Sequence, residues 1–306
     1  MASEGVSART VIVEVAINGA TPKRKNPNVP VTPEEIAIDV LACLEAGASI
    51  VHNHIDRFGG TGDETAARYL EGWRPVLAAR PDALLYPTTN AGATVEASFC
   101  HLEPLVRECA MRVGLCDPGS VNFGALDTDG VPRGGFVYRN SHDDAYFQME
   151  LCRRLGLGPQ LAIFEPGFLR AALAWWRAGR LAPGAMIKLY FGGANGYLGG
   201  GGRGVPFGLP PTLNSLAAYL DLLGDCDVPW SAAVIGGDLC GELDGDFVRA
   251  VLDAGGHLHV GLEDYHATRV PTNVSLLQEA TAIVESSGRG VATPVETAAL
   301  LKLPPR

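Results

Sequence analysis

The chain has 306 residues, of which 47% are hydrophobic and 19% charged, so it can bury a large core. A formal net charge of −10, with no basic run, argues against a nucleic-acid partner. No apolar stretch reaches the ~20 residues that cross a bilayer, so we expect no membrane partner. Residues 1–9 do not read as a signal peptide, and seven scattered cysteines without C-x-x-C spacing fit reduced thiols. We therefore expect a cytoplasmic protein.

Strand-like and helix-like segments alternate from the amino terminus onward. Residues 10–17 (TVIVEVAI) form a β-branched run that is typical of a strand buried on both faces. After a loop bounded by prolines, residues 32–35 (TPEE) predict the start of a helix that ends near Gly47. Residues 49–51 predict the second strand, which runs directly into His52-Asn53-His54.

The same alternation continues to the carboxyl end of the chain. Further strands are expected at residues 83–88, 111–115, 160–164, 185–191, 230–235 and 257–261. Further helices are expected at residues 64–79, 95–109, 142–155, 169–178, 213–223, 246–254 and 274–286. Residues 116–140 are expected to be irregular. Eight strand–helix units without a break in composition favour one (β/α)8 TIM barrel over a doubly wound open sheet. We expect a single barrel domain over residues 1–306, with a C-terminal extension after the last helix.

The two histidines that end the second strand suggest a metal site. Side chains alternate faces along a strand, so His52 and His54 point the same way. Two imidazoles on one face are half of a divalent-metal site, and hydrogen-bonded core histidines are the alternative. His259, Glu263 and Asp264 lie at the end of the eighth strand, which closure of a barrel would bring near the second. A set of two histidines and a glutamate leaves positions for water or substrate, as in catalytic zinc sites.

One carboxylate lies in the middle of an expected strand. Glu14 interrupts the apolar run of residues 10–17, and burying an unpaired carboxylate is costly. Two interpretations stay open: a core carboxylate with a buried partner, and a residue of the functional site.

Several short motifs occur in a characteristic order along the chain. They are residues 18–20 (NGA), 30–37 (PVTPEEIA), 45–48 (EAGA), 121–124 (VNFG), 255–257 (GGH), 261–264 (GLED), 273 (N) and 292–294 (ATP). Together with His52-x-His54, they make the chain similar to the β-keto acid cleavage enzymes over nearly its full length, as a divergent member. The resemblance implies a (β/α)8 barrel, a homo-oligomer, and one zinc ion per chain bound by His52, His54 and Glu263.

The resemblance also implies an activity. In the family, a retro-Claisen acyl transfer converts a β-keto acid and acetyl-CoA to acetoacetate and a new acyl-CoA. Zinc bound by two neutral imidazoles and one carboxylate keeps a net positive charge, so it can stabilise an enolate. Asp264 matches the position of the family's base. Matching positions place substrate contacts at Asn18, Thr21 and Thr88, where Thr88 keeps the hydroxyl of a family serine.

The departures from the family pattern bear on mechanism and substrate. His259 stands where the family has an arginine paired with the base, and we favour a base dyad with Asp264 over metal ligation or a space-filling role. A second arginine, usual after the seventh strand, is replaced within residues 236–238 (GGD). Thr21 and Ala162 replace two family glutamates, the first of which receives the amino group of the type enzyme's substrate. We therefore expect a substrate tail that is neutral or apolar.

Two classes of function stay open. The first is a carbon–carbon bond-cleaving acyltransferase, or a metal-dependent lyase or hydrolase that does not use CoA; Asp264 beside the metal ligands favours this class. The second is a relative that binds a metal-chelated carboxylate without acyl transfer, which the loss of the arginine favours.

His257 shares a face with His259, but its family counterpart belongs to the barrel framework, so we expect it to have a hydrogen-bonded structural role.

Overall fold

A sheet of eight parallel strands forms the centre of the protein in a computed structural model, which describes residues 10–197 and 204–305. In chain order its strands are β2 (Val13–Ala16), β3 (Ile50–Asn53), β4 (Leu85–Pro87), β5 (Val113–Cys116), β8 (Gly158–Ile163), β9 (Met186–Gly192), β10 (Trp230–Ile235) and β11 (His257–Val260). Their order in the sheet is β4-β3-β2-β11-β10-β9-β8-β5. The two end strands, β4 and β5, lie next to each other, so the sheet is nearly closed. The predicted TIM barrel is confirmed.

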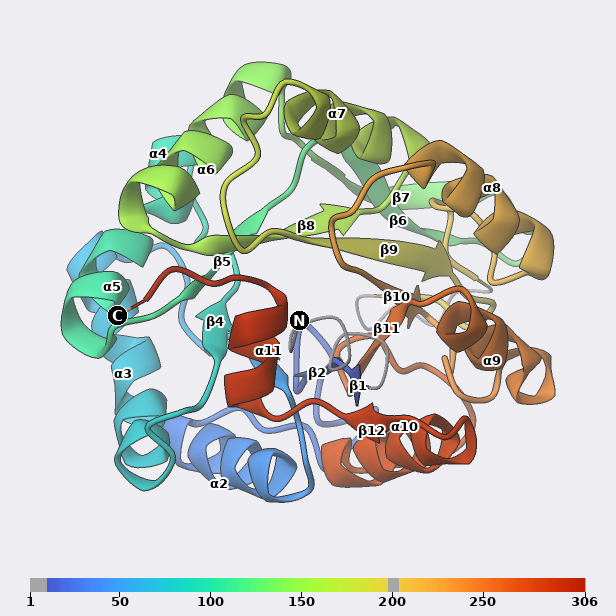
Figure 1. Ribbon diagram of the computed structural model, residues 1–306, viewed down its shortest axis with the longest axis horizontal. Coiled ribbons are helices and arrows are strands. Elements are labelled where there is room, and N and C mark those ends of the chain that lie inside the picture. Colours follow the sequence, from blue (N-terminus) through green and yellow to red (C-terminus); the bar gives the residue numbers. More distant parts are fainter. Residues whose placement is uncertain (1–9, 198–203, 306) are drawn as a thin grey trace, which may run out of the picture.

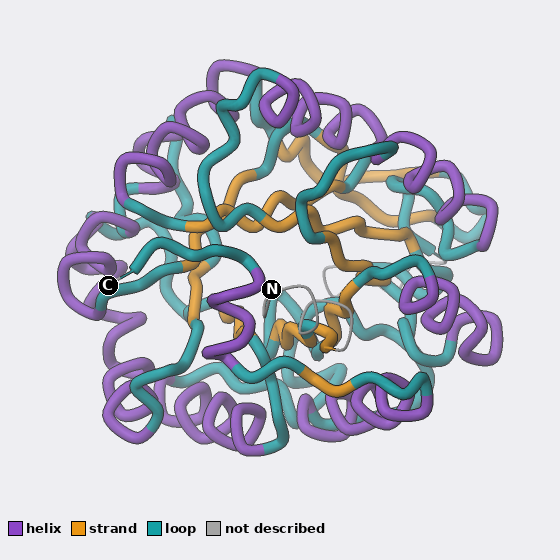
Figure 2. The backbone as a smooth tube through the Cα atoms, in the orientation of Figure 1, coloured by secondary structure: helices purple, strands orange, loops and turns teal. Residues whose placement is uncertain are grey.

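Helices surround the strands in a ring (Figure 1). They are α2 (Pro33–Glu45), α3 (Gly62–Ala79), α4 (Val95–Phe99), α5 (Leu102–Cys109), α6 (His142–Leu155), α7 (Pro166–Arg177), α8 (Leu213–Leu223), α9 (Asp246–Asp253), preceded by the 3-10 turn η1 (Glu242–Gly245), and α10 (Asn273–Ser286). Figure 2 shows the strands enclosed by this helical layer. Because both faces of each strand are covered, strands such as β2 and β11 are buried along their whole length.

Local sequence sets where the helices begin, as α2 illustrates. Thr32 accepts a hydrogen bond from the backbone N–H of Glu35, and the Glu35 carboxylate accepts one from the backbone N–H of Thr32. Pro33 occupies the first helical position, where its missing N–H costs nothing. Ile36 and Val40 then follow at a spacing of one turn and are buried against the sheet. This start agrees with the one predicted from residues 32–35.

Two expected segments differ from the structure. Residues 116–140 are not irregular throughout, because β6 (Val121–Leu126) and β7 (Pro132–Tyr138) form an antiparallel hairpin. Most of β7 is exposed, so it lacks the apolar alternation that marks a strand. The helix expected over residues 95–109 is divided into α4 and α5. The break lies beside His101, whose Nε2 donates to the carbonyl of Thr88 at 2.9 Å.

The extension after α10 covers the amino end of the barrel. It contains β12 (Gly290–Val291), which pairs with β1 (Thr10–Val11), and α11 (Pro294–Leu300). The Ser49 hydroxyl, just before β3, donates to the carbonyl of Ala292 at 2.6 Å. In Figure 1, α11 lies in front of the sheet, so the carboxyl ends of the strands face away from the viewer. None of the helices in the described part of the chain combines the length and apolar character needed to span a membrane.

Candidate metal centre and active site

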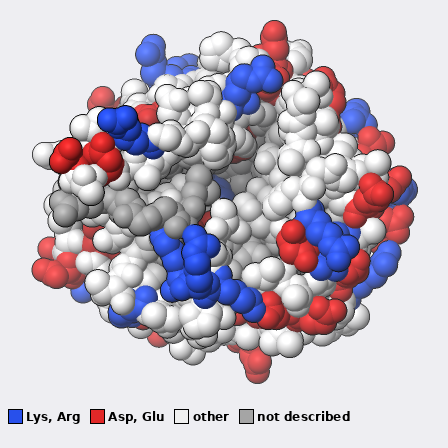
Figure 3. Space-filling model, turned by 180° about the vertical axis from the view of Figure 1, so that it is seen from behind, with Lys and Arg blue, Asp and Glu red and all other residues white. Residues whose placement is uncertain are grey.

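A pocket of about 370 Å³ opens at the carboxyl end of the barrel. That face is hollowed near its centre (Figure 3). Most of the large side chains around the pocket are aromatic: Phe58, Tyr86, Phe123, Phe136, Tyr138, Phe164, Tyr190 and Tyr197. Its polar lining includes His52, His54, Thr88, Asp117, Gln160, Lys188 and Glu263. The pocket therefore combines an apolar wall with a small set of titratable groups.

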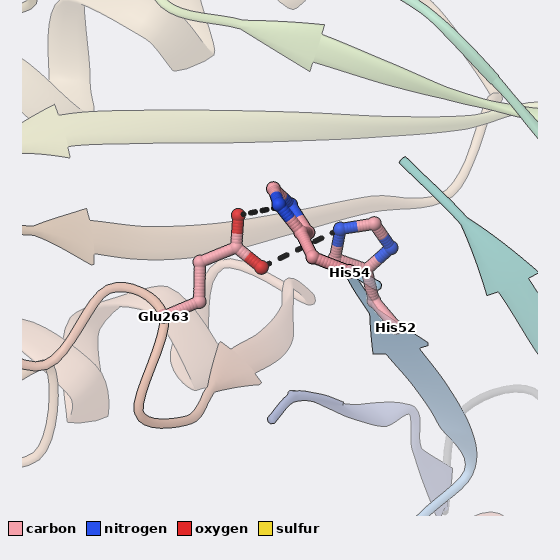
Figure 4. Close-up of side chains that lie close together, drawn as sticks. All are labelled: His52, His54 and Glu263. Atoms are coloured by element: carbon pink, nitrogen blue, oxygen red, sulfur yellow. Dashed lines mark ion pairs between the residues drawn. The ribbon is translucent and has the colours of Figure 1, made fainter. Parts of the chain in front are cut away.

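His52, His54 and Glu263 converge at one side of this pocket (Figure 4). The Nε2 atoms of His52 and His54 lie 3.4 and 3.1 Å from the two carboxylate oxygens of Glu263. The three candidate ligand atoms lie within 4.8 Å of one another. Ligands ~2.0–2.1 Å from a tetrahedral zinc ion are about 3.4 Å apart, so the spacing suits such an ion.

The hydrogen bonding of His52 tests whether a cation fits. Its Nδ1 lies 3.2 Å from the carbonyl oxygen of Tyr86, which can only accept, so Nδ1 carries the hydrogen. This leaves the lone pair of Nε2 facing Oε2 of Glu263, which has no hydrogen-bond partner among the described residues. Burial lowers the pKa of His52 to about 3, so no proton bridges the two atoms at neutral pH. A divalent cation would satisfy both lone pairs, and the residues therefore fit a metal.

Two glycines allow the close packing that positions Glu263. Gly19 has a φ of +54°, and a Cβ atom there would lie 2.3 Å from Cγ of Glu263. Gly261 has a φ of +137°, and its Cβ would lie 2.1 Å from the carbonyl oxygen of Ala16. Only glycine allows this close approach, which lets the Glu263 N–H donate to Ala16 at 3.1 Å. These glycines fix the carboxylate beside the two imidazoles.

The three residues expected to contact substrate lie in different environments. The carboxamide of Asn18 accepts from the N–H of His54 at 2.8 Å and donates to its carbonyl at 3.1 Å, so it holds the backbone of a candidate ligand. The Thr21 hydroxyl is buried and donates to the carbonyl of Glu263 at 3.4 Å. Thr88 lines the pocket itself.

Asp264 and His259 lie next to each other behind the candidate metal ligands. Nε2 of His259 is 3.0 Å from Oδ2 of Asp264, and both side chains are buried. Burial raises the pKa of Asp264, and the His259 imidazole opposes part of this rise. The two residues line a small cavity that adjoins the barrel end, and the ring of Tyr190, which lines the main pocket, packs edge-on against His259 at 5.5 Å. The predicted pair is thus adjacent to the pocket wall.

A buried polar network continues from His259 into the barrel interior. Oε1 of Glu14 lies 3.4 Å from Nδ1 of His259 and 2.8 Å from Nζ of Lys188. The Tyr86 hydroxyl donates to the same carboxylate oxygen and accepts from Nζ of Lys188. Sequence reasoning left Glu14 open and missed Lys188 and Tyr86. The available signal was a lone lysine within the apolar strand AMIKLYF, whose full burial requires an anionic partner.

His257 and the loop at residues 236–238 both form hydrogen bonds to other parts of the barrel. The backbone N–H of Ile12 donates to Nδ1 of His257 at 3.0 Å, so this imidazole accepts a framework hydrogen bond. Within residues 236–238, where the resemblance implies that a second arginine has been replaced, Asp238 accepts from Nη2 of Arg269 at 2.8 Å. The N–H of Gly236 donates to the carbonyl of Asp264 at 2.9 Å, which ties this loop to the candidate base.

Comparison with known proteins places the chain among named enzymes. It is 30% identical over 306 residues to the 3-oxoadipate:acetyl-CoA acetyltransferase of Cupriavidus necator, covering 96% of this chain and 95% of that protein. It is 28% identical over 327 residues to the 3-dehydrocarnitine:acetyl-CoA trimethylamine transferase of Rhizobium meliloti, covering 97% and 98%. It is 26% identical over 296 residues to the 3-keto-5-aminohexanoate cleavage enzyme of Acetoanaerobium sticklandii, covering 95% and 97%.

Solved structures share the fold. The apo structure of ObcA matches with a TM-score of 0.66 at 18% identity, covering 90% of this chain and 66% of that one. Residues 10–303 match the family described as beta-keto acid cleavage enzyme. This match spans the barrel, the candidate ligands and the loop that carries Asp264. The chain belongs to the beta-keto acid cleavage enzyme family.

Proposed function

We propose that the protein is a zinc-dependent acyltransferase that cleaves the carbon–carbon bond of a β-keto acid with acetyl-CoA as the second substrate. The observation that carries this proposal is the convergence of His52, His54 and Glu263 on one pocket, with Asp264 directly beside Glu263. Membership of the family and the acetyl-CoA-dependent names of two relatives support it.

The proposed chemistry assigns a role to each polar group. His52, His54 and Glu263 would hold a zinc ion, which would supply Lewis-acid stabilisation of negative charge on the oxygens of a β-keto acid. Asp264 takes a proton from the carbon between the ketone and the carboxylate, and its raised pKa makes it a stronger base. His259, 3.0 Å from Oδ2, forms the dyad that orients this carboxylate. Because His259 lies outside the three candidate ligands, it does not fill a coordination position that water or substrate would need.

The rest of the reaction balances without a further reactant. The deprotonated carbon forms a bond to the thioester carbonyl of acetyl-CoA, whose carbon–sulfur bond breaks and releases the CoA thiolate. The thiolate then adds to the original ketone carbonyl, and the bond from this carbonyl to the central carbon breaks. The central carbon takes back the proton held by Asp264. The original acyl group is transferred to the sulfur of CoA. The products are acetoacetate, which carries the acetyl group, and a new acyl-CoA. Lys and Arg side chains gather beside the hollow in Figure 3, where they suit the phosphates of CoA.

Mass spectrometry of the products tests this function. The zinc-loaded protein is incubated with a panel of β-keto acids, with and without acetyl-CoA labelled with carbon-13 in the acetyl group. We expect labelled acetoacetate and an unlabelled new acyl-CoA only when both substrates are present. Cleavage without acetyl-CoA would instead indicate a lyase or hydrolase. Binding of the keto acid without any product would indicate the carboxylate-binding alternative.

A further inference from the structure

Gln160 is a buried amide that the metal chemistry does not use. It lies on β8, is 2% exposed, and lines the pocket. Neither its Oε1 nor its Nε2 has a hydrogen-bond partner within residues 10–197 and 204–305. A buried amide without partners destabilises the fold, so its presence on a pocket wall indicates a ligand that pairs with it.

The space beside Gln160 is open because Ala162 is small. Side chains alternate along a strand, so Gln160 and Ala162 face the same side, and both line the pocket. On the neighbouring strand β9, Lys188 is the register partner of Ala162. A larger residue at position 162 would occupy the space between the carboxamide and the ammonium. Gln160, Ala162 and Lys188 therefore enclose one corner of the pocket, which we name the distal subsite.

The donors of the distal subsite limit the chemistry of its ligand. An ammonium has three N–H donors, and the contacts of Lys188 to Glu14 and Tyr86 account for two of them. The Gln160 carboxamide can both donate and accept. The positive charge of Lys188 is already paired with Glu14 at 2.8 Å, so an anionic group would gain little there. An ammonium group would find no acceptor on Lys188, whose Nζ carries only donors.

We infer that the distal subsite binds a neutral oxygen function, a hydroxyl or a ketone, on the tail of a β-keto acid. The aromatic lining of the pocket accommodates the carbon chain between this oxygen and the metal ligands. This inference rests on the proposed function and names the substrate class for it. Gln160 is thereby a specificity-determining residue, because a tail without the oxygen would leave the amide unpaired.

Calorimetric binding of matched probes tests the inference. The full-length protein is titrated, without acetyl-CoA, with 3-oxohexanoate and with its 5-hydroxy and 6-hydroxy derivatives. We expect at least one hydroxylated probe to bind about 10-fold more tightly than the alkyl probe, the discrimination of a single hydrogen-bonding site. Gln160→Met keeps the size of the side chain and should remove this preference by weakening only the hydroxylated probe. Gln278→Met, on the exposed face of α10, is the matched control.

A second variant and a separate assay of acyl transfer distinguish the possible outcomes. Ala162→Leu fills the subsite while Gln160 itself is unchanged, and it should also remove the preference. This second variant guards against a folding defect in Gln160→Met. Equal binding of all three probes to the unmodified protein, or a preference that survives in both variants, would overturn the inference. Acyl transfer is read separately by mass spectrometry of acyl-CoA, so its failure would leave the binding preference to be judged by itself.

Discussion

The carboxylate of Glu14 and the ammonium of Lys188 lie 2.8 Å apart inside the barrel, on strands β2 and β9. Both side chains are almost fully buried. Burial alone would raise the pKa of Glu14, but Lys188 and His259 hold it below its ordinary range. Glu14 thus keeps its negative charge beside His259, next to the candidate base.

The stabilities of variants at the two positions of this pair should not be additive. Glu14→Gln or Lys188→Met leaves one buried charge without its partner, and we expect a loss of about 3–5 kcal/mol in the free energy of unfolding. The double variant should lose less than the sum of the single losses. Urea denaturation of the four proteins measures the coupling as a double-mutant cycle. Strictly additive losses would show that the two charges do not depend on each other.

The metal content should depend on the three convergent ligands. We expect about one zinc ion per chain in the purified protein, and a loss of that ion in His52→Ala, His54→Ala and in Glu263→Gln. Elemental analysis after dialysis gives the metal-to-protein ratio. His142→Ala, at an exposed histidine on α6, is the control for nonspecific binding. Unchanged metal in the His52, His54 double variant would exclude this site.

His259→Ala should lose turnover and retain metal. The imidazole lies 3.0 Å from Asp264 and outside the group of candidate ligands, so its removal disturbs the base and not the ion. We expect a fall in kcat of about 100-fold or more, the size of a general-base contribution. His259→Arg places the family's residue beside Asp264 and should recover part of the activity. Loss of zinc from His259→Ala would identify His259 as a ligand instead.

An ammonium group on the substrate tail should reduce kcat/KM. Ala162 and Thr21 provide no carboxylate at the two family positions, and Lys188 places a positive charge on the pocket wall. The carboxyl of Asp117 also lines the pocket, but it already accepts the hydroxyl of Tyr138. Steady-state kinetics on 5-amino-3-oxohexanoate and 3-oxohexanoate make the comparison. A higher kcat/KM for 5-amino-3-oxohexanoate than for 3-oxohexanoate would refute the prediction.

Asp39 should make the stability depend on pH in the acid range. Burial raises the pKa of Asp39 from 3.8 to about 6, so the folded protein binds this proton more tightly than the unfolded chain. Its contribution is therefore most favourable below about pH 4 and declines as the pH rises to 6. Asp39→Asn keeps an acceptor for the Asn273 amide and removes the titration. Relative to the unmodified protein, it should gain about 1–2 kcal/mol between pH 4 and pH 7 in urea denaturation.

The barrel and one side of the candidate site could be predicted because their signals are periodic or local. Alternating strands and helices determine the ring, and two histidines at a strand end mark one side of the site. Lys188 and Gln160 could not be assigned, because strands buried on both faces have no polar alternation that shows which side chains point inward. The hairpin of β6 and β7 was missed for the opposite reason, because most of β7 is exposed and its pattern resembles a loop.

The position of Glu263 has a consequence for folding. Its partners His52 and His54 precede it by about 200 residues, so the full candidate metal triad forms only after β11 has docked beside β2. A nascent chain that lacks β11 presents two imidazoles and no carboxylate, and would hold an ion weakly. An ion that binds only the folded state stabilises it by mass action. Bound zinc would therefore stabilise the contact between the first and last barrel strands. Tight metal uptake would therefore report the completion of the barrel.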